Sequence, residues 1–125
     1  MITLGFFTEI DNHPTVVFKP SLSGIDRTPA GSIVVTPFDR ADMVKYEQYA
    51  PVLGLIVYSP TDFIVAAKCG VKYAVASYGL AKLIQKIADN YLYDTRVLAL
   101  IDEEEEIEQA AMDEIDGVIS SHLLS

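Results

Sequence analysis

The stretch that decides the fold is RVLALIDEEEEIEQAAMDEIDGVISS, residues 96–121. It opens with a short apolar run, RVLALI (96–101), and closes with another, DGVIS (116–120). The acidic segment between them carries Ile107 and Ala111 at helical spacing. Short apolar runs bounded by turn residues are typical of strands that are buried on both faces, as in parallel sheets. The stretch therefore predicts a strand, a helix and a second strand.

The same alternation recurs upstream, where SIVVT (32–36), LGLIVY (53–58) and KYAVA (72–76) are similar apolar runs. Helices are expected at 40–49, at 63–69 after a cap at 59–62, from 77 or 78 onward, and after Asp102. The five strand starts fall about twenty residues apart, a spacing that indicates right-handed crossovers and a parallel sheet. We therefore expect an α/β domain with a mainly parallel five-stranded sheet. Periodicity leaves open whether this sheet is an open three-layer sheet or a half-barrel.

The N-terminal part has a different pattern. MITLGFF (1–7) and TVVFK (15–19) are predicted strands, and the turn residues of EIDNHP between them favour an N-terminal β-hairpin, with His13 in the turn. The next segment, PSLSGIDRTPAG (20–31), is predicted to be a loop, because it contains two prolines and two glycines. The chain is then a single domain, 1–125, made of a hairpin (1–19), a loop (20–31) and repeating strand–helix units (32–125).

Composition excludes several classes of function. The formal net charge is −9, and no lysine or arginine follows Arg96, so nucleic acid and anionic membranes are not expected as partners. The apolar runs are too short to span a bilayer and the N-terminus lacks the basic start of a signal peptide, so we expect a cytoplasmic protein. The single cysteine, Cys69, is expected in the core. Dinucleotide, P-loop and zinc motifs are absent, so no cofactor or metal is expected.

The order of the elements indicates where a site would lie. In parallel α/β sheets, ligands bind beyond the carboxyl ends of the strands. The candidate ligand-binding residues at this edge are Asp39, Ser59, Asp62, Ser77, Tyr78, Asp102, Ser121 and His122. Asp39, Asp62 and Asp102 also stand where helix caps are expected, and Glu105 would complete a capping box with Asp102. If this edge held a divalent ion, its ligands would be Asp39, Asp102 and His122.

Residues 71–124 carry a resemblance to a known family. LALIDEEEEIE followed by DGVISSH resembles the last two strand–helix units of glycerophosphodiester phosphodiesterases, which are (β/α) barrels. The resemblance implies a barrel-like sheet and points to metal-assisted phosphodiester hydrolysis. However, that family's His-Arg-Gly opening, its Glu-Asn-Thr and its Glu-x-Asp metal ligands have no counterpart here. No catalytic residue is therefore carried over.

A second resemblance covers residues 31–76. GSIVVTPFDRADM, followed by IVAAKCGVKYAV, is similar to the phosphohistidine swivelling domain of phosphoenolpyruvate-utilising enzymes. The matching register places Thr61 where that family has its phosphorylated histidine. The resemblance thus implies such a domain without its chemistry.

The function favoured by the sequence is a non-catalytic binding or assembly module whose small-molecule ligand is not identified. We expect a homodimer that covers an exposed sheet edge, because the runs at 32–36 and 116–120 would stand at the two ends of the repeat. One alternative is a metal-assisted, phosphodiesterase-like hydrolase with its site at the carboxyl edge. Another is a regulatory domain that senses a small anion at the helix N-termini after Ser59, Ser77 and Asp102.

Overall fold

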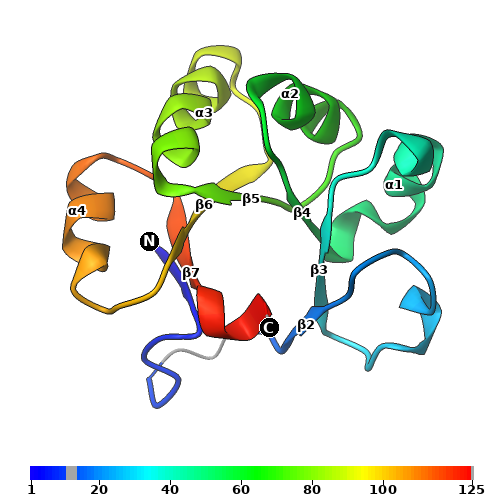
Figure 1. The fold of residues 1–125 in the computed structure, drawn as a ribbon, viewed down its shortest axis with the longest axis horizontal. Helices are drawn as coiled ribbons and strands as arrows, with labels where there is room; N and C mark the ends of the chain where they lie inside the picture. The colour runs from blue at the N-terminus through cyan, green and yellow to red at the C-terminus, as the bar shows by residue number, and fades with distance from the viewer. Residues whose placement is uncertain (11–13, 125) are drawn as a thin grey trace.

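A computed structural model describes residues 1–10 and 14–124 of the chain. Within these residues, seven strands form one parallel sheet in the order β1-β7-β6-β5-β4-β3-β2, and Figure 1 shows that the sheet is curled into a half-barrel. The strands are β1 (Ile2–Leu4), β2 (Val16–Phe18), β3 (Ile33–Pro37), β4 (Leu53–Ile56), β5 (Tyr73–Ser77), β6 (Arg96–Ile101) and β7 (Gly117–Ser120). The expected α/β class with a parallel sheet is confirmed. Of the two forms that periodicity left open, the sheet adopts the half-barrel.

The predicted N-terminal hairpin is wrong, and so is the count of five strands. β1 pairs in parallel with β7, and β2 pairs in parallel with β3, so the two N-terminal strands lie at opposite edges of the sheet. The runs at 32–36 and 116–120 are consequently inner strands. Turn residues indicate that the chain reverses, but they do not determine which strand an edge strand will pair with. The turn residues at 11–13, including His13, lie outside the described residues.

The described residues form four α-helices. Figure 1 shows that these helices lie on the outer face of the curled sheet. They are α1 (Met43–Tyr49), α2 (Pro60–Lys68), α3 (Tyr78–Tyr91) and α4 (Glu106–Met112). Short 3-10 helices are η1 (Ile25–Arg27), η2 (Arg40–Asp42), η3 (Ala50–Val52) and η4 (Ser121–Leu124). The helix expected at 40–49 is therefore divided between η2 and α1. No helix in the described part of the chain is long and apolar enough to cross a membrane.

The start of α4 differs from the prediction. Asp102 and Glu105 were expected to form a capping box, but α4 begins at Glu106 and neither side chain caps it. Instead, the Glu106 carboxylate accepts hydrogen bonds from the backbone N–H groups of Asp102 and Glu103, both at 2.9 Å. The capping-box prediction is wrong because a turn separates the end of β6 from the helix. A carboxylate of the acidic run therefore still accepts hydrogen bonds from backbone N–H groups ahead of the helix, but it belongs to Glu106.

The curled sheet separates two apolar clusters. The outer cluster lies between the sheet and the helices and includes the buried Tyr46, Phe63 and Ile84. The inner cluster lies inside the curl and is formed by alternate strand residues: Leu4, Ile33, Val35, Tyr73, Val75, Leu98 and Ile119. Successive strand residues point to opposite faces, so each inner strand supplies both clusters. The interior of the half-barrel is therefore a packed apolar core.

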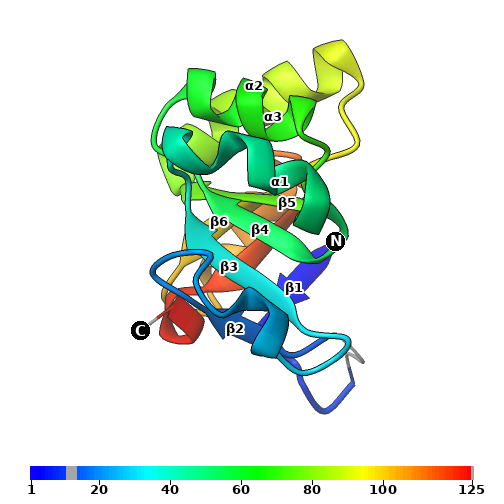
Figure 2. The same ribbon diagram turned by 90° about the vertical axis from the view of Figure 1, so that its right-hand side faces the viewer.

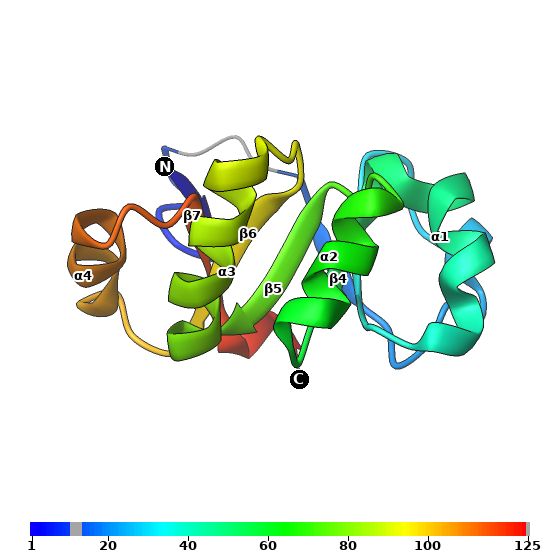
Figure 3. The ribbon, with the colours of Figure 1, turned by 90° about the horizontal axis from the view of Figure 1, so that it is seen from above.

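The short helix η4 lies at the carboxyl ends of the strands, as Figure 3 shows from above. Its Leu123 and Leu124 pack against the inner cluster. η4 also contacts β2, beside which it lies in Figure 2. On the other side it reaches the end of β1, where a Cβ added to Gly5 would lie 2.9 Å from Leu123 Cδ1. η4 therefore lies between the carboxyl ends of the two edge strands, which do not pair with each other.

Candidate functional site

Three of the predicted edge residues form local caps. The Asp39 carboxylate accepts a hydrogen bond from the backbone N–H of Ala41 at 2.9 Å. Ser59 Oγ accepts one from the N–H of Asp62 at 3.1 Å, and the Asp62 carboxylate accepts one from the N–H of Tyr58 at 3.1 Å. Asp39 and Ser59 therefore cap the helical turns that follow β3 and β4, and Asp62 ties the start of α2 back to the end of β4.

Two of the predicted edge residues, each of which directly follows one of two neighbouring strands, contact each other. Ser121 Oγ donates a hydrogen bond to Asp102 Oδ1 at 2.5 Å. The backbone N–H of His122, the next residue, donates to Ser120 Oγ at 3.2 Å. These contacts join the end of β6 to the start of η4, so Asp102 helps to hold η4 in place.

Tyr78 holds α4 against α3. Its hydroxyl donates a hydrogen bond to the Asp113 carboxylate, and Lys82 Nζ lies 3.8 Å from the same carboxylate. Burial of the Tyr78 hydroxyl, together with this hydrogen bond, raises the pKa of Tyr78 to about 12, and the bond lowers the pKa of Asp113. Tyr78 is therefore protonated near neutral pH. Ser77, at the N-terminus of α3, is exposed and makes no side-chain cap.

The hypothetical metal ligands are not assembled. In residues 1–10 and 14–124, no three His, Cys, Asp or Glu side chains form a group that could hold a metal ion. Asp39, Asp102 and His122 all belong to these described residues. A smaller cavity of about 340 Å³ does include Asp39 and Asp62, together with Phe38 and Arg40. This cavity lies beside the ends of β2 and β3.

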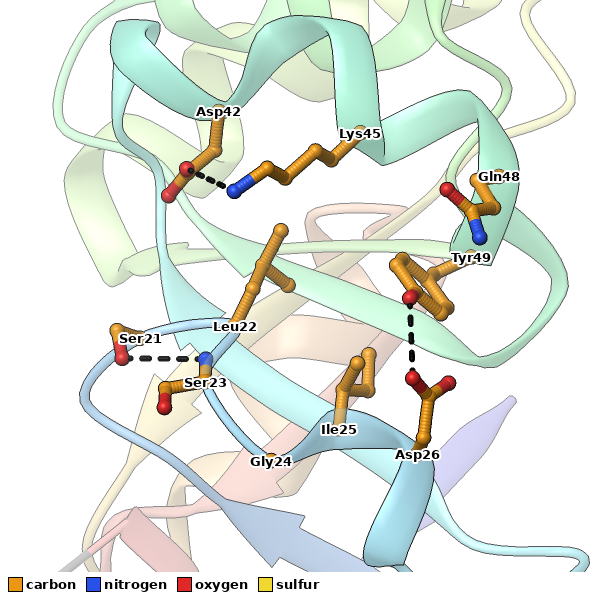
Figure 4. A pocket seen from close by; sticks show the side chains of 10 residues that line it. All are labelled: Ser21, Leu22, Ser23, Gly24, Ile25, Asp26, Asp42, Lys45, Gln48 and Tyr49. Atoms are coloured by element: carbon orange, nitrogen blue, oxygen red, sulfur yellow. Dashed lines mark hydrogen bonds and ion pairs between the residues drawn. The ribbon is translucent and has the colours of Figure 1, made fainter.

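A larger cavity, of about 480 Å³, lies between the segment 21–26 and α1. We call it the loop–α1 cleft, and Figure 4 shows it from close by. It is lined by Ser21, Leu22, Ser23, Gly24, Ile25, Asp26, Asp42, Lys45, Gln48 and Tyr49. It adjoins the smaller cavity, with which it shares Ser21 and Asp42.

The loop–α1 cleft combines an apolar floor with polar walls. Leu22 and Ile25 are buried and belong to the outer core cluster. On the α1 side, Lys45 Nζ lies 3.8 Å from an Asp42 carboxylate oxygen. Opposite them, Asp26 accepts a hydrogen bond from Tyr49 Oη across the cleft at 3.4 Å, as Figure 4 shows.

This arrangement offers several hydrogen-bonding groups to a ligand. Ser21 Oγ accepts a bond from the N–H of Ser23, and the Ser23 hydroxyl and Gln48 amide also line the cleft. A hydroxyl or an amide can both donate and accept hydrogen bonds, whereas a carboxylate accepts them. Two carboxylates and one ammonium group line the cleft, so its local charge is negative. Such a site suits a ligand with hydroxyl or amino groups.

Sequence reasoning missed this cleft because it treated residues 20–31 as a loop without a role. One sequence signal for a packed segment was the pair Leu22 and Ile25 among polar residues, and both side chains are buried in the structure. A second signal was the spacing of Asp42, Lys45 and Tyr49, which places them on one side of a helix. Neither signal shows that the two segments face each other.

No family model and no curated protein matches this chain. The resemblances to glycerophosphodiester phosphodiesterases and to the phosphohistidine swivelling domain therefore stay predictions.

Proposed function

We propose that the chain is a non-catalytic binding module that holds a small polar molecule in the loop–α1 cleft. The observation that carries this proposal is the cleft itself, with about 480 Å³ of space, an apolar floor and several polar side chains. Ligand sites have this volume and this combination of groups. η4 lies at the carboxyl ends of the strands, the usual ligand position of parallel α/β folds, and packs there against the inner cluster. The smaller cavity beside the ends of β2 and β3 stays open and adjoins the loop–α1 cleft.

The state of the carboxyl edge supports a binding role over a catalytic one. Asp39, Ser59 and Asp62 are engaged in hydrogen bonds to backbone N–H groups. Tyr78 has a pKa of about 12, far from the value near neutrality that a general acid or base needs. No observation at this edge favours the metal-assisted hydrolase.

The charge of the cleft favours a neutral or cationic ligand. Asp26 and Asp42 outnumber Lys45, and the chain as a whole carries −9. An anion would approach against this field. Two of the helix N-termini offer little to an anion, since Ser59 caps α2 and the Glu106 carboxylate occupies the N–H groups ahead of α4, whereas the start of α3 has no side-chain cap. We therefore favour a polyol, a sugar or a small amine over the anion-sensing alternative.

A thermal-shift screen tests the proposal. The panel contains neutral sugars and polyols, aliphatic amines, inorganic phosphate, sugar phosphates and divalent ions. A polyol, sugar or amine present at 100 times its dissociation constant should stabilise the protein by about 2.7 kcal/mol, because it binds only the native state. Gln48→Ala and Asp26→Asn should abolish the shift, since both side chains line the cleft.

The matched control is Glu108→Gln, since Glu108 is an exposed residue of α4, and Figure 1 shows α4 apart from α1, which forms one wall of the cleft. This variant should keep the full shift. Stabilisation by phosphates or divalent ions alone would contradict the proposal and revive the alternatives. A shift that survives in both cleft variants would place the ligand elsewhere.

We further propose that the module works in the cytoplasm and, because the chain is acidic, that it has no nucleic-acid or membrane partners. A homodimer also remains part of the proposal. The runs at 32–36 and 116–120 do not form the sheet edges, because both are inner strands; the edge strands are β1 and β2.

A further inference from the structure

A groove of about 320 Å³ lies between α1 and α2, on the helical face of the molecule. We call it the α1–α2 groove. Met43, Val44 and Val65 make it mainly apolar, and Cys69 lines its end. Val44 has 92% of its surface exposed. A β-branched residue has a lower helix propensity than alanine or leucine, and here it gains no burial within the chain in return.

Two charged residues of opposite sign stand at the groove, one on each helix. Glu47 belongs to α1 and Lys68 to α2. The ion pairs within the described residues join Lys45 to Asp42, Lys82 to Asp113 and Arg96 to Asp116. Glu47 and Lys68 therefore make no ion pair inside the part of the chain that the structure describes, although both lie beside an apolar surface.

We propose that a second copy of this chain docks on the α1–α2 groove to form a two-fold symmetric dimer. A two-fold axis through the groove places Glu47 of each copy opposite Lys68 of the other. The charges of Glu47 and Lys68 are then complementary between the two copies, as an isologous interface requires. The apolar centre then buries Val44, the most exposed large apolar residue among the described ones.

Charge argues against other occupants of the groove. A strongly basic partner would meet Lys68, and a strongly acidic one would meet Glu47. A surface with one charge of each sign is matched by its own symmetry mate. Six residues line the groove, fewer than the roughly 20–30 residues a side of a standard interface, so we expect a weak dimer that dissociates on dilution. This inference is independent of the ligand proposed for the loop–α1 cleft.

A charge-swap series, followed by sedimentation equilibrium of the full chain, tests the dimer. The unmodified chain should pass from monomer to dimer over the micromolar range. Glu47→Lys and Lys68→Glu should each raise the dissociation constant at least about tenfold, because each places like charges opposite one another across the axis. The double variant, Glu47→Lys with Lys68→Glu, should return the constant to within about threefold of the original, since both pairs are restored in reverse.

Two further variants separate this geometry from general effects. Val44→Ser should weaken the dimer without lowering the thermal midpoint of the dilute monomer, because Val44 is exposed there. Glu108→Lys, on α4, changes the net charge as Glu47→Lys does and should leave the constant unchanged. A strict monomer at every concentration would overturn the proposal. So would a double variant that associates no better than the single ones, or an equal effect of Glu108→Lys.

Discussion

The junction between β1 and β7 depends on a glycine, and replacing that glycine tests the pairing that the sequence did not predict. Gly117 opens β7 and lies opposite Ile2 in the register. A Cβ built on Gly117 would lie 2.5 Å from the carbonyl oxygen of Ile2 and 2.9 Å from Leu98 Cδ2. The nearest of these atoms belongs to the backbone, so no side-chain rotation can relieve the contact. Gly117→Ala should therefore push β1 away from the sheet.

The magnitude follows from two opposing terms. Forcing an extra methyl group into a packed region costs about 1–3 kcal/mol. The alanine also restricts the unfolded chain, which offsets about 0.4–1 kcal/mol of that loss. Because the clash involves the backbone, we expect the upper part of the range and a net loss of about 2 kcal/mol. For a domain of this size, that corresponds to a fall in the thermal midpoint of about 5–10 °C.

The matched control is the same substitution at Gly79. This residue lies in the first turn of α3, and a Cβ there would meet nothing within 4 Å. Gly79→Ala should raise stability by about 0.5–1 kcal/mol, because alanine loses less conformational freedom than glycine in a helix. Chemical denaturation followed by circular dichroism measures both variants. If Gly117→Ala proved as stable as Gly79→Ala, the close pairing of β1 with β7 would be refuted.

Three other predictions concern the core, a helix end and a hydrogen bond. Leu98→Ala in the inner cluster should cost about 2–5 kcal/mol in urea denaturation, whereas Leu83→Ala on the half-exposed face of α3 should cost less than about 1 kcal/mol; equal losses would contradict a packed interior. Leu92 adopts φ +55° while 85% exposed, so Leu92→Gly should stabilise the fold by up to about 1 kcal/mol, and a lower thermal midpoint would argue against that strain. Because the pKa of Tyr78 is raised from 10.0 to about 12, its contribution to stability is full below pH 10 and is lost as the pH rises to 12. Tyr78→Phe should flatten the pH dependence of the urea midpoint in this window, and an unchanged slope would mean that the hydrogen bond to Asp113 does not form.

The local parts of the site were predictable. The sequence Ser59-Pro60-Thr61-Asp62 predicted a capped helix start, and the structure has Ser59 as the cap of α2. Asp39 was likewise expected as a cap and accepts a bond from Ala41. Such contacts join residues two or three positions apart, so the sequence contains both partners in one short window.

The wrong or missed features depend on contacts or turns that the sequence pattern does not specify. The Asp102 capping box failed because a turn intervened before α4, and the prediction assumed that the helix would start directly after the strand. The hairpin failed because strand pairing depends on which edges are free once the rest of the sheet has formed. The loop–α1 cleft was missed because its two walls come from separate segments that meet only after folding.

The sequence by itself determined the inner strands, the helices between them, the parallel direction of the sheet and the acidic character of the chain, because each follows from local periodicity, local turn chemistry or composition. The tertiary structure alone decided that β1 joins β7 and that β2 joins β3, since those hydrogen bonds connect distant segments of the chain. It also decided the curl of the sheet and the position of η4 between the ends of the edge strands. In this fold, the curl encloses a core of alternate strand residues, η4 covers one end of it, and the polar cleft forms outside, against α1.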